Sequence, residues 1–91
     1  MITAFVFIDA DVALIPEVAE KVAALDGVTE VYSVTGRIDL IAVVRVRDHE
    51  AVAEVVTGQI NKVPGITGTE THIAFRAYSR HDLEAAFSLG I

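Results

Sequence analysis

The chain has 91 residues, of which 53% are hydrophobic, and carries a formal net charge of −6. This length predicts a single domain, residues 1–91, and seven basic residues among thirteen acids argue against direct binding to nucleic acid. The absence of cysteine excludes disulfides and thiolate chemistry, no apolar run approaches the length of a membrane span, and the N-terminus does not resemble a signal peptide, so we expect a cytoplasmic protein with no membrane partner.

Strand-like and helix-like segments alternate along the chain. Runs rich in Phe, Val and Ile predict strands at residues 2–9, 28–35, 39–47 and 66–78. Apolar residues at helical spacing predict helices at residues 14–25 and 49–62, with Asp48 as the N-cap of the second, and each helix ends before a glycine. The segment Ser79-Arg-His-Asp82 predicts the start of a short last helix that turns Leu83 and Phe87 inward.

The apolar pattern of the first half repeats in the second half. A shift of 38 positions places Thr3 on Ile41, Val22 on Ile60 and Gly27 on Gly65 without a gap. Each half therefore encodes one β-α-β unit. The predicted fold is α+β, a ferredoxin-like βαββαβ sandwich with a C-terminal helix, in which two helices cover one face of an antiparallel sheet.

Alternation along the strands predicts which side chains face the helices. Successive strand side chains point to opposite faces of a sheet. We assign the smaller set to the helices: Ala4, Val6 and Ile8, with their repeat equivalents Ala42, Val44 and Val46. The opposite face then carries Phe5, Phe7, Ile41 and Val43, together with Tyr32 and Val34.

This second face would be a large apolar patch on a monomer, which soluble proteins avoid. A second copy packed sheet against sheet is the simplest cover. Phe5, Phe7, Ile41 and Val43 are therefore predicted to form a homodimer interface. The alternative is that the last helix of the same chain covers part of the face.

Residues that could support catalysis are sparse. The histidines are His49, His72 and His81, and none has a second ligand at metal-binding spacing. The sequence has no Ser-His-Asp arrangement with local support, no Gly-rich phosphate loop and no pair of carboxylates in an apolar setting. We therefore predict no catalytic residue, no metal and no cofactor.

Two polar segments are candidates for a ligand site. Thr35-Gly36-Arg37-Ile38-Asp39 connects the second and third predicted strands, and Thr67-Gly-Thr69-Glu-Thr71 lies in the fourth. On one interpretation these are only turn formers and strand-favouring threonines. On the other they bind a zwitterion: backbone N–H groups around Gly36 take a carboxylate, Asp39 takes an ammonium, and the hydroxyls add directional hydrogen bonds.

The stretch Gly27-Val-Thr-Glu-Val-Tyr-Ser-Val-Thr-Gly-Arg-Ile-Asp-Leu40, followed by Pro64-Gly-Ile-Thr-Gly-Thr-Glu-Thr71, resembles the effector-binding domain of the Lrp/AsnC family, which regulates amino-acid metabolism. The resemblance covers essentially the whole chain. It implies sheets that pair into a dimeric α/β barrel, further assembly into rings that are often octamers, and amino-acid effectors bound where dimers meet. It also implies a role for each matching residue: Gly36, Arg37, Ile38 and Asp39 match the family's ligand loop, and Thr69 and Thr71 match its fourth-strand segment. Asp39 would then bind the ammonium or orient the backbone.

Full-length family regulators add an N-terminal helix-turn-helix domain, whereas this chain begins at the first strand of the effector domain. It thus resembles the stand-alone members, which do not bind operator DNA alone. The resemblance favours a non-enzymatic amino-acid sensing and oligomerisation module, with a full-length Lrp/AsnC regulator as a candidate partner. The alternatives are a small dimeric α/β-barrel enzyme, such as a cofactor-free monooxygenase or an isomerase, and a purely structural oligomerisation domain. The enzyme would need polar groups between sheet and helices, where the sequence places Ala, Val and Ile.

Overall fold

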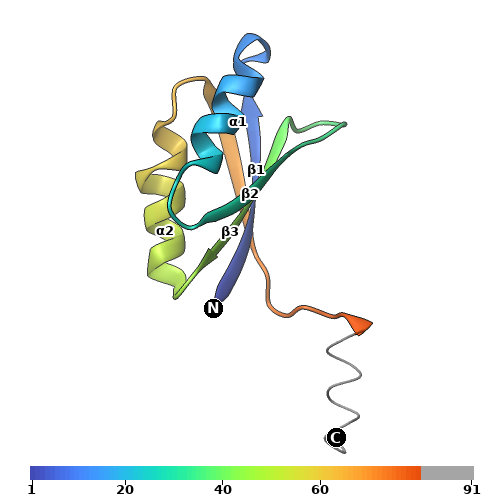
Figure 1. The fold of residues 1–91 in the computed structure, drawn as a ribbon, viewed down its shortest axis with the longest axis vertical. Helices are drawn as coiled ribbons and strands as arrows, with labels where there is room; N and C mark the ends of the chain where they lie inside the picture. Colours follow the sequence, from blue (N-terminus) through green and yellow to red (C-terminus); the bar gives the residue numbers. More distant parts are fainter. Residues whose placement is uncertain (81–91) are drawn as a thin grey trace, which may run out of the picture.

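The computed structural model describes residues 1–80, in which strands and helices follow the βαββαβ order (Figure 1). The strands are β1 (Ile2–Ala10), β2 (Val28–Ser33), β3 (Leu40–Val46) and β4 (Ile66–Ile73). The helices are α1 (Ile15–Ala23) and α2 (His49–Gly58), with the 3-10 turns η1 (Val12–Leu14) before α1 and η2 (Ile60–Lys62) after α2. The predicted C-terminal helix, including Leu83 and Phe87, lies outside the described residues.

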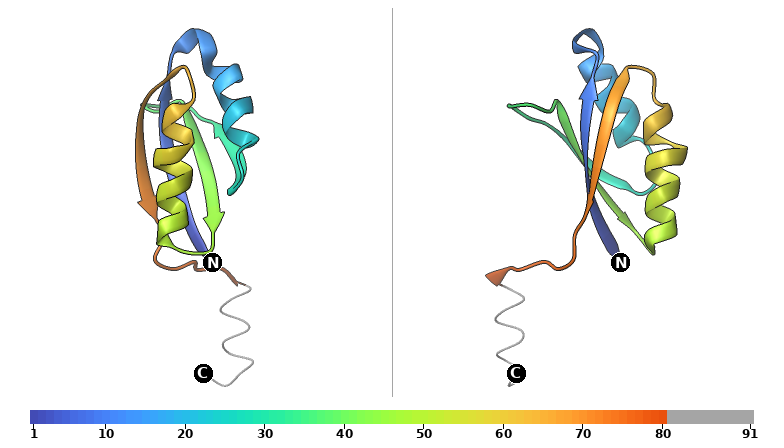
Figure 2. Two further views of the ribbon diagram at one scale, coloured as in Figure 1. Left: turned by 90° about the vertical axis from the view of Figure 1, so that its left-hand side faces the viewer. Right: turned by 180° about the vertical axis from the view of Figure 1, so that it is seen from behind.

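The sheet interleaves the two halves of the sequence. Its strand order is β2-β3-β1-β4, and every neighbouring pair is antiparallel. The equivalent strands β1 and β3 pair in the centre, with Phe5 opposite Val43, and β2 and β4 form the edges. Both helices lie on one face of the sheet (Figure 2), so the ferredoxin-like α+β prediction is confirmed.

The core lies between the sheet and the helices. The predicted helix-facing residues of β1 are fully buried, as are Ala42 and Val44 of β3. Val46 packs against the core but stays half-buried because it is the last residue of β3. The helices complete the cluster with apolar side chains: Val18, Val22, Val52, Val55, Val56 and Ile60. Packing of this set contributes the hydrophobic free energy that holds the two layers together.

The repeat places equivalent glycines in equivalent close contacts. Gly27 has φ of +92°, and a Cβ there would come within 2.9 Å of the Val55 side chain on α2. Gly65 has φ of +99°, and a Cβ there would come within 2.9 Å of the Val18 side chain on α1. Each glycine thus lets the chain leave one helix in a left-handed conformation while it touches the other helix.

Both helices are shorter than their predicted ranges, and each is flanked by a 3-10 turn. Before α1, the Asp11 carboxylate accepts from the Ala13 N–H, which starts η1. The predicted cap of α2 is confirmed, since the Asp48 carboxylate accepts from the Ala51 N–H at 2.8 Å. The chain then tightens into η2 after Gly58, so the single helix predicted at residues 49–62 was wrong in its last turn.

The strand predicted at residues 66–78 ends at Ile73, five residues early. Its partner β1 begins at Ile2, and the Ala74 N–H still donates to the Thr3 carbonyl oxygen. Beyond that bond β1 has almost no residues left to pair with. Residues 74–80, which we call the arm, therefore leave the sheet and run away from the helices (Figures 1 and 2).

None of the helices within residues 1–80 is long and apolar enough to cross a membrane.

Candidate functional site

The sheet face that points away from the helices, called the outer face, has an apolar centre and charged ends. Its centre combines Phe5 and Phe7 of β1 with Tyr32 of β2 and Ile41 and Val43 of β3. Phe5 is 38% and Tyr32 51% exposed, and Phe7 and Ile41 are half-buried. Val43 is only 5% exposed, because it lies on an inner strand between its neighbours on β1 and β2. It therefore adds little area to the predicted dimer interface.

Each edge strand carries an interacting pair of side chains, and in each pair the two residues are two positions apart in the sequence. On β2 the Tyr32 hydroxyl donates to the Glu30 carboxylate at 2.5 Å. This hydrogen bond raises the pKa of Tyr32 above its ordinary 10.0, and the negative charge of the same carboxylate is the second cause of the increase. On β4 the His72 Nε2 lies 2.5 Å from a Glu70 oxygen, and the His72 ring contacts the Phe7 ring with centroids 4.8 Å apart.

The loop between β2 and β3 is held closed by Asp39. Its carbonyl oxygen accepts from the Val34 N–H at 3.1 Å, and its N–H donates to the Ile8 carbonyl oxygen at 3.0 Å. Its side-chain Oδ2 accepts from the Ala10 N–H at 2.9 Å, just past the last β1–β3 pair. Asp39 thus has the loop-holding role that we weighed against ligand binding, and its ligand role stays a prediction.

The fourth-strand threonines lie on the helix side of the sheet. The register pairs Thr69 with Ile8 and Thr71 with Val6, two residues that face the core. The Thr69 hydroxyl donates to the Asn61 side-chain oxygen in η2 at 2.7 Å, and Thr71 is exposed. The hydroxyls do share one side of β4, and that side is opposite to the outer face.

A pocket of about 220 Å³ brings part of the predicted site together where the loop meets the edge of the outer face. Seven residues line it: Phe7, Asp9, Arg37, Ile38, Gly68, Thr69 and Glu70. Of the predicted ligand residues, Arg37, Ile38 and Thr69 line this pocket, and Gly36, Asp39 and Thr71 do not. Gly36 sits at the loop tip with φ of +104° and no neighbour near its Cβ position.

Sequence reasoning missed the two acids of this pocket. Asp9 follows Phe5 and Phe7 on the outward row of β1, and strand alternation alone would have placed it there. Glu70 lies opposite Phe7, which requires the β1–β4 register. The lining of the pocket therefore includes one basic residue, Arg37, and two acids, Asp9 and Glu70.

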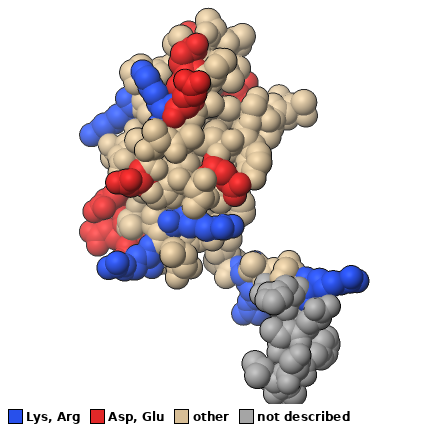
Figure 3. Space-filling model, viewed as in Figure 1, with Lys and Arg blue, Asp and Glu red and all other residues tan. Residues whose placement is uncertain are grey.

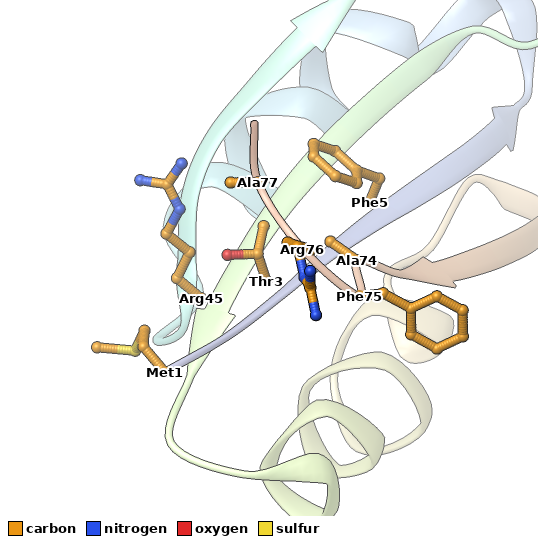
Figure 4. Close-up of a pocket in the computed structure, with 8 residues that line it drawn as sticks. All are labelled: Met1, Thr3, Phe5, Arg45, Ala74, Phe75, Arg76 and Ala77. Atoms are coloured by element: carbon orange, nitrogen blue, oxygen red, sulfur yellow. The ribbon is translucent and has the colours of Figure 1, made fainter. Parts of the chain in front are cut away.

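A second pocket of about 310 Å³ lies at the other end of the outer face, where the arm begins (Figure 4). It lies between Thr3, Phe5 and Arg45 on the sheet and the first residues of the arm. Its charged side chains are Arg45 and Arg76, and Figure 4 shows the Phe75 ring turned away from Phe5.

The space between sheet and helices holds no candidate for catalysis within the described residues. All residues buried there are apolar, and no polar or charged residue is buried in residues 1–80. The pair of His72 and Glu70 lies on the outer face with 54% and 69% of the side chains exposed. The same part of the chain contains no group of three or more His, Asp or Glu that could hold a metal ion. This pair therefore does not supply the polar groups between sheet and helices that a barrel-type enzyme would need.

Comparison with known proteins relates this chain to one family of regulators. Residues 3–83 match the family model of the Lrp/AsnC ligand binding domain. A helix-turn-helix-type transcriptional regulator of Pyrococcus furiosus is 38% identical over 76 residues, which cover 80% of this chain and 51% of that protein. The chain thus spans about half the length of the curated relatives it matches.

Solved structures share the fold over most of the chain. A protein from Thermus thermophilus superimposes with a TM-score of 0.84 at 49% identity, covering 88% of this chain and 100% of that one. AsnC of E. coli superimposes with a TM-score of 0.80 at 29% identity, covering 86% of this chain and 53% of that one.

Proposed function

Because the chain belongs to the Lrp/AsnC ligand-binding domain family, whose relatives are transcription regulators, we propose that it senses a free amino acid and self-associates through its outer face. The observation that carries the proposal is the pocket beside the loop. Arg37, Asp9 and Glu70 all line this pocket, so the site offers a partner to each charge of a zwitterion.

The pocket suits a small polar ligand in size and chemistry. Its volume of about 220 Å³ lies below the range of about 300–1,000 Å³ for pockets that hold drug-sized molecules. The Arg37 guanidinium is a good partner for an α-carboxylate, and the carboxylates of Asp9 and Glu70 would hold the α-ammonium. This assignment moves the ammonium partner from Asp39, which does not line the pocket, to Asp9 and Glu70, which do. One Glu70 oxygen already contacts His72, so its other oxygen would take the ammonium.

Self-association follows from the uncovered outer face. Two copies packed sheet against sheet at about 10 Å would bury Phe5, Phe7, Tyr32 and Ile41. The pocket lies at the margin of that face and shares Phe7 with it, so a second dimer or the partner protomer would reduce its exposure to water. The proposal includes a dimeric barrel that assembles further, an octamer by family resemblance. It also includes cytoplasmic action and a full-length Lrp/AsnC regulator as a partner.

The ligand proposal is tested by thermal denaturation with each of the twenty amino acids. A ligand at about 100 times its Kd should add about 2.7 kcal/mol of stability, which in a domain of this size raises Tm by roughly 10 °C or more. Arg37→Ala and Glu70→Gln should abolish the shift. Arg47→Ala removes the same charge from an exposed position outside this pocket and should keep it. If no amino acid shifts Tm, the purely structural oligomerisation domain becomes the better interpretation.

Self-association is tested by sedimentation velocity at micromolar concentration. The natural chain should sediment as a dimer or larger, and Phe5→Asp should sediment as a monomer with an unchanged far-UV circular dichroism spectrum. Val12→Asp introduces the same charge at an exposed apolar residue of η1, away from the outer face, and should leave the assembly intact. A natural chain that is monomeric at this concentration contradicts the proposal.

A further inference from the structure

We propose that the arm, residues 74–80, docks on the outer face of a second copy of this chain, so that two protomers exchange arms. The inference rests on the proposed self-association. It adds a contact that packing of one sheet on another does not require.

The arm exposes aromatic side chains that its own protomer leaves uncovered. Phe75 is 104% and Tyr78 79% exposed, more than any aromatic residue of the strands. Exposed aromatic residues close together in sequence are typical of segments that bury them against a partner. In Figure 4 the Phe75 ring points away from Phe5, and its full exposure leaves it free to contact another molecule.

The arm borders only one end of its own outer face. The hydrogen bond from Ala74 to Thr3 fixes the start of the arm at the end of β1, where the sheet stops. From there the arm runs outward on the side opposite the helices, which is the side of the outer face (Figures 1 and 2). A second copy that packs on the outer face would therefore lie next to the arm.

Charge makes the arm complementary to the body of the chain. Residues 74–80 contain two arginines, Arg76 and Arg80, and no acid. Residues 1–73 contain five basic residues and eleven acids, a formal charge of −6. In Figure 3 the arm carries blue atoms at the edge of a body with abundant red atoms. On the outer face itself, acids stand at both edges of the apolar centre: Asp9, Glu30 and Glu70.

A second copy fits these observations better than nucleic acid does. Two arginines would neutralise few phosphates, and the acidic body would repel a nucleic acid backbone. A twofold dimer uses the same patch on both protomers, so an arm that reaches the partner's outer face is matched by a second equivalent contact. In both halves of such a pair, an arm with two aromatic residues and two arginines would meet an aromatic face with acidic edges.

The first test uses the absence of natural cysteine. One preparation carries Tyr78→Cys on the arm. A second, with a different affinity tag, carries His72→Cys on the outer face or Gly58→Cys at the end of α2 on the helix side. The two are mixed at equal concentration in a glutathione redox buffer. The arm should form a disulfide with the outer-face position at least about tenfold more than with the helix-side position. Equal yields at the two positions would overturn the inference.

The second test measures the dimer dissociation constant of the full chain by sedimentation equilibrium. Phe75→Ala, Tyr78→Ala and Arg76→Glu should each weaken dimerisation by about tenfold or more, the usual threshold for an important interface residue. Val12→Ala, a truncation of an exposed apolar residue far from the arm, should leave it unchanged. Arm exchange is contradicted, and self-association stands, if three results are found together: the natural chain dimerises, Phe5→Asp breaks the dimer, and the arm variants have no effect. A natural chain that stays monomeric overturns both.

Discussion

Asp39→Ala should destabilise the fold in the absence of any ligand. The Asp39 Oδ2 accepts the Ala10 N–H at 2.9 Å, and Ala10 is only 7% exposed, so truncation leaves a buried donor without its partner. Such an orphaned group costs about 1–3 kcal/mol. The expected loss is therefore about 2 kcal/mol of unfolding free energy, or a fall in Tm of roughly 8–16 °C at about 4–8 °C per kcal/mol. Asp39→Asn should lose less than half of this, because its amide oxygen can still accept the bond.

The measurement is urea denaturation followed by far-UV circular dichroism, at one fixed protein concentration because association also shifts apparent stability. Asp9→Ala is the matched control: it removes the same charge from an exposed side chain nearby on β1. If the free energy of unfolding of Asp39→Ala lies within about 0.5 kcal/mol of this control, the ordinary range for surface substitutions, the loop-holding role of Asp39 is refuted.

Further substitutions test the fold and its surface. Gly65→Ala and Gly36→Ala both place a side chain at positive φ, which costs about 1–2 kcal/mol. Gly65→Ala also meets a helix at 2.9 Å, so denaturation should show the larger loss there; equal losses would contradict the close packing. Asp48→Ala should lose about 1 kcal/mol as its helix cap disappears, and a loss near zero in the same assay would contradict the cap. Glu30→Ala should lower the raised pKa of Tyr32 towards 10.0, measured by phenolate absorbance against pH. In the natural chain the raised pKa of Tyr32 stabilises the folded state, fully so below pH 10.0, and this stabilisation is lost as the pH rises through the folded-state pKa. If Tyr32 titrates in the variant as it does in the natural chain, the Tyr32–Glu30 hydrogen bond is contradicted.

The arrangement of the two layers could be predicted because it depends on local periodicity. Alternation separated Ala4 and Val6 from Phe5 and Phe7, and the structure buries the first pair against the helices and leaves Phe5 exposed. The repeat predicted equivalent glycines at the helix ends, and both have positive φ. Each of these features depends on only one strand or one helix end, so it can be predicted from the local sequence alone.

The content of the pocket could not be predicted because it depends on register. Glu70 joins Phe7 only through the antiparallel pairing of β1 with β4. The same pairing turns the hydroxyls of Thr69 and Thr71 to the helix side of β4. Likewise, β4 ends early because β1 starts at Ile2 and offers no further partner. Residues 74–78, which include Phe75, do not themselves indicate this end.

The proposed ligand binding and the proposed self-association would be coupled through a shared residue. Phe7 lines the pocket and also belongs to the apolar centre of the outer face, and its ring contacts His72 at the edge. A ligand that orders Arg37 and Glu70 around the pocket therefore changes a margin of the surface on which a second copy would pack. By thermodynamic reciprocity, any factor by which the ligand strengthens association is also the factor by which association strengthens ligand binding. A ligand with equal affinity for the free and associated chain would change nothing, however tightly it bound. A pocket at the margin of the interface gives the ligand a direct route to such a difference, because association changes the surroundings of Phe7.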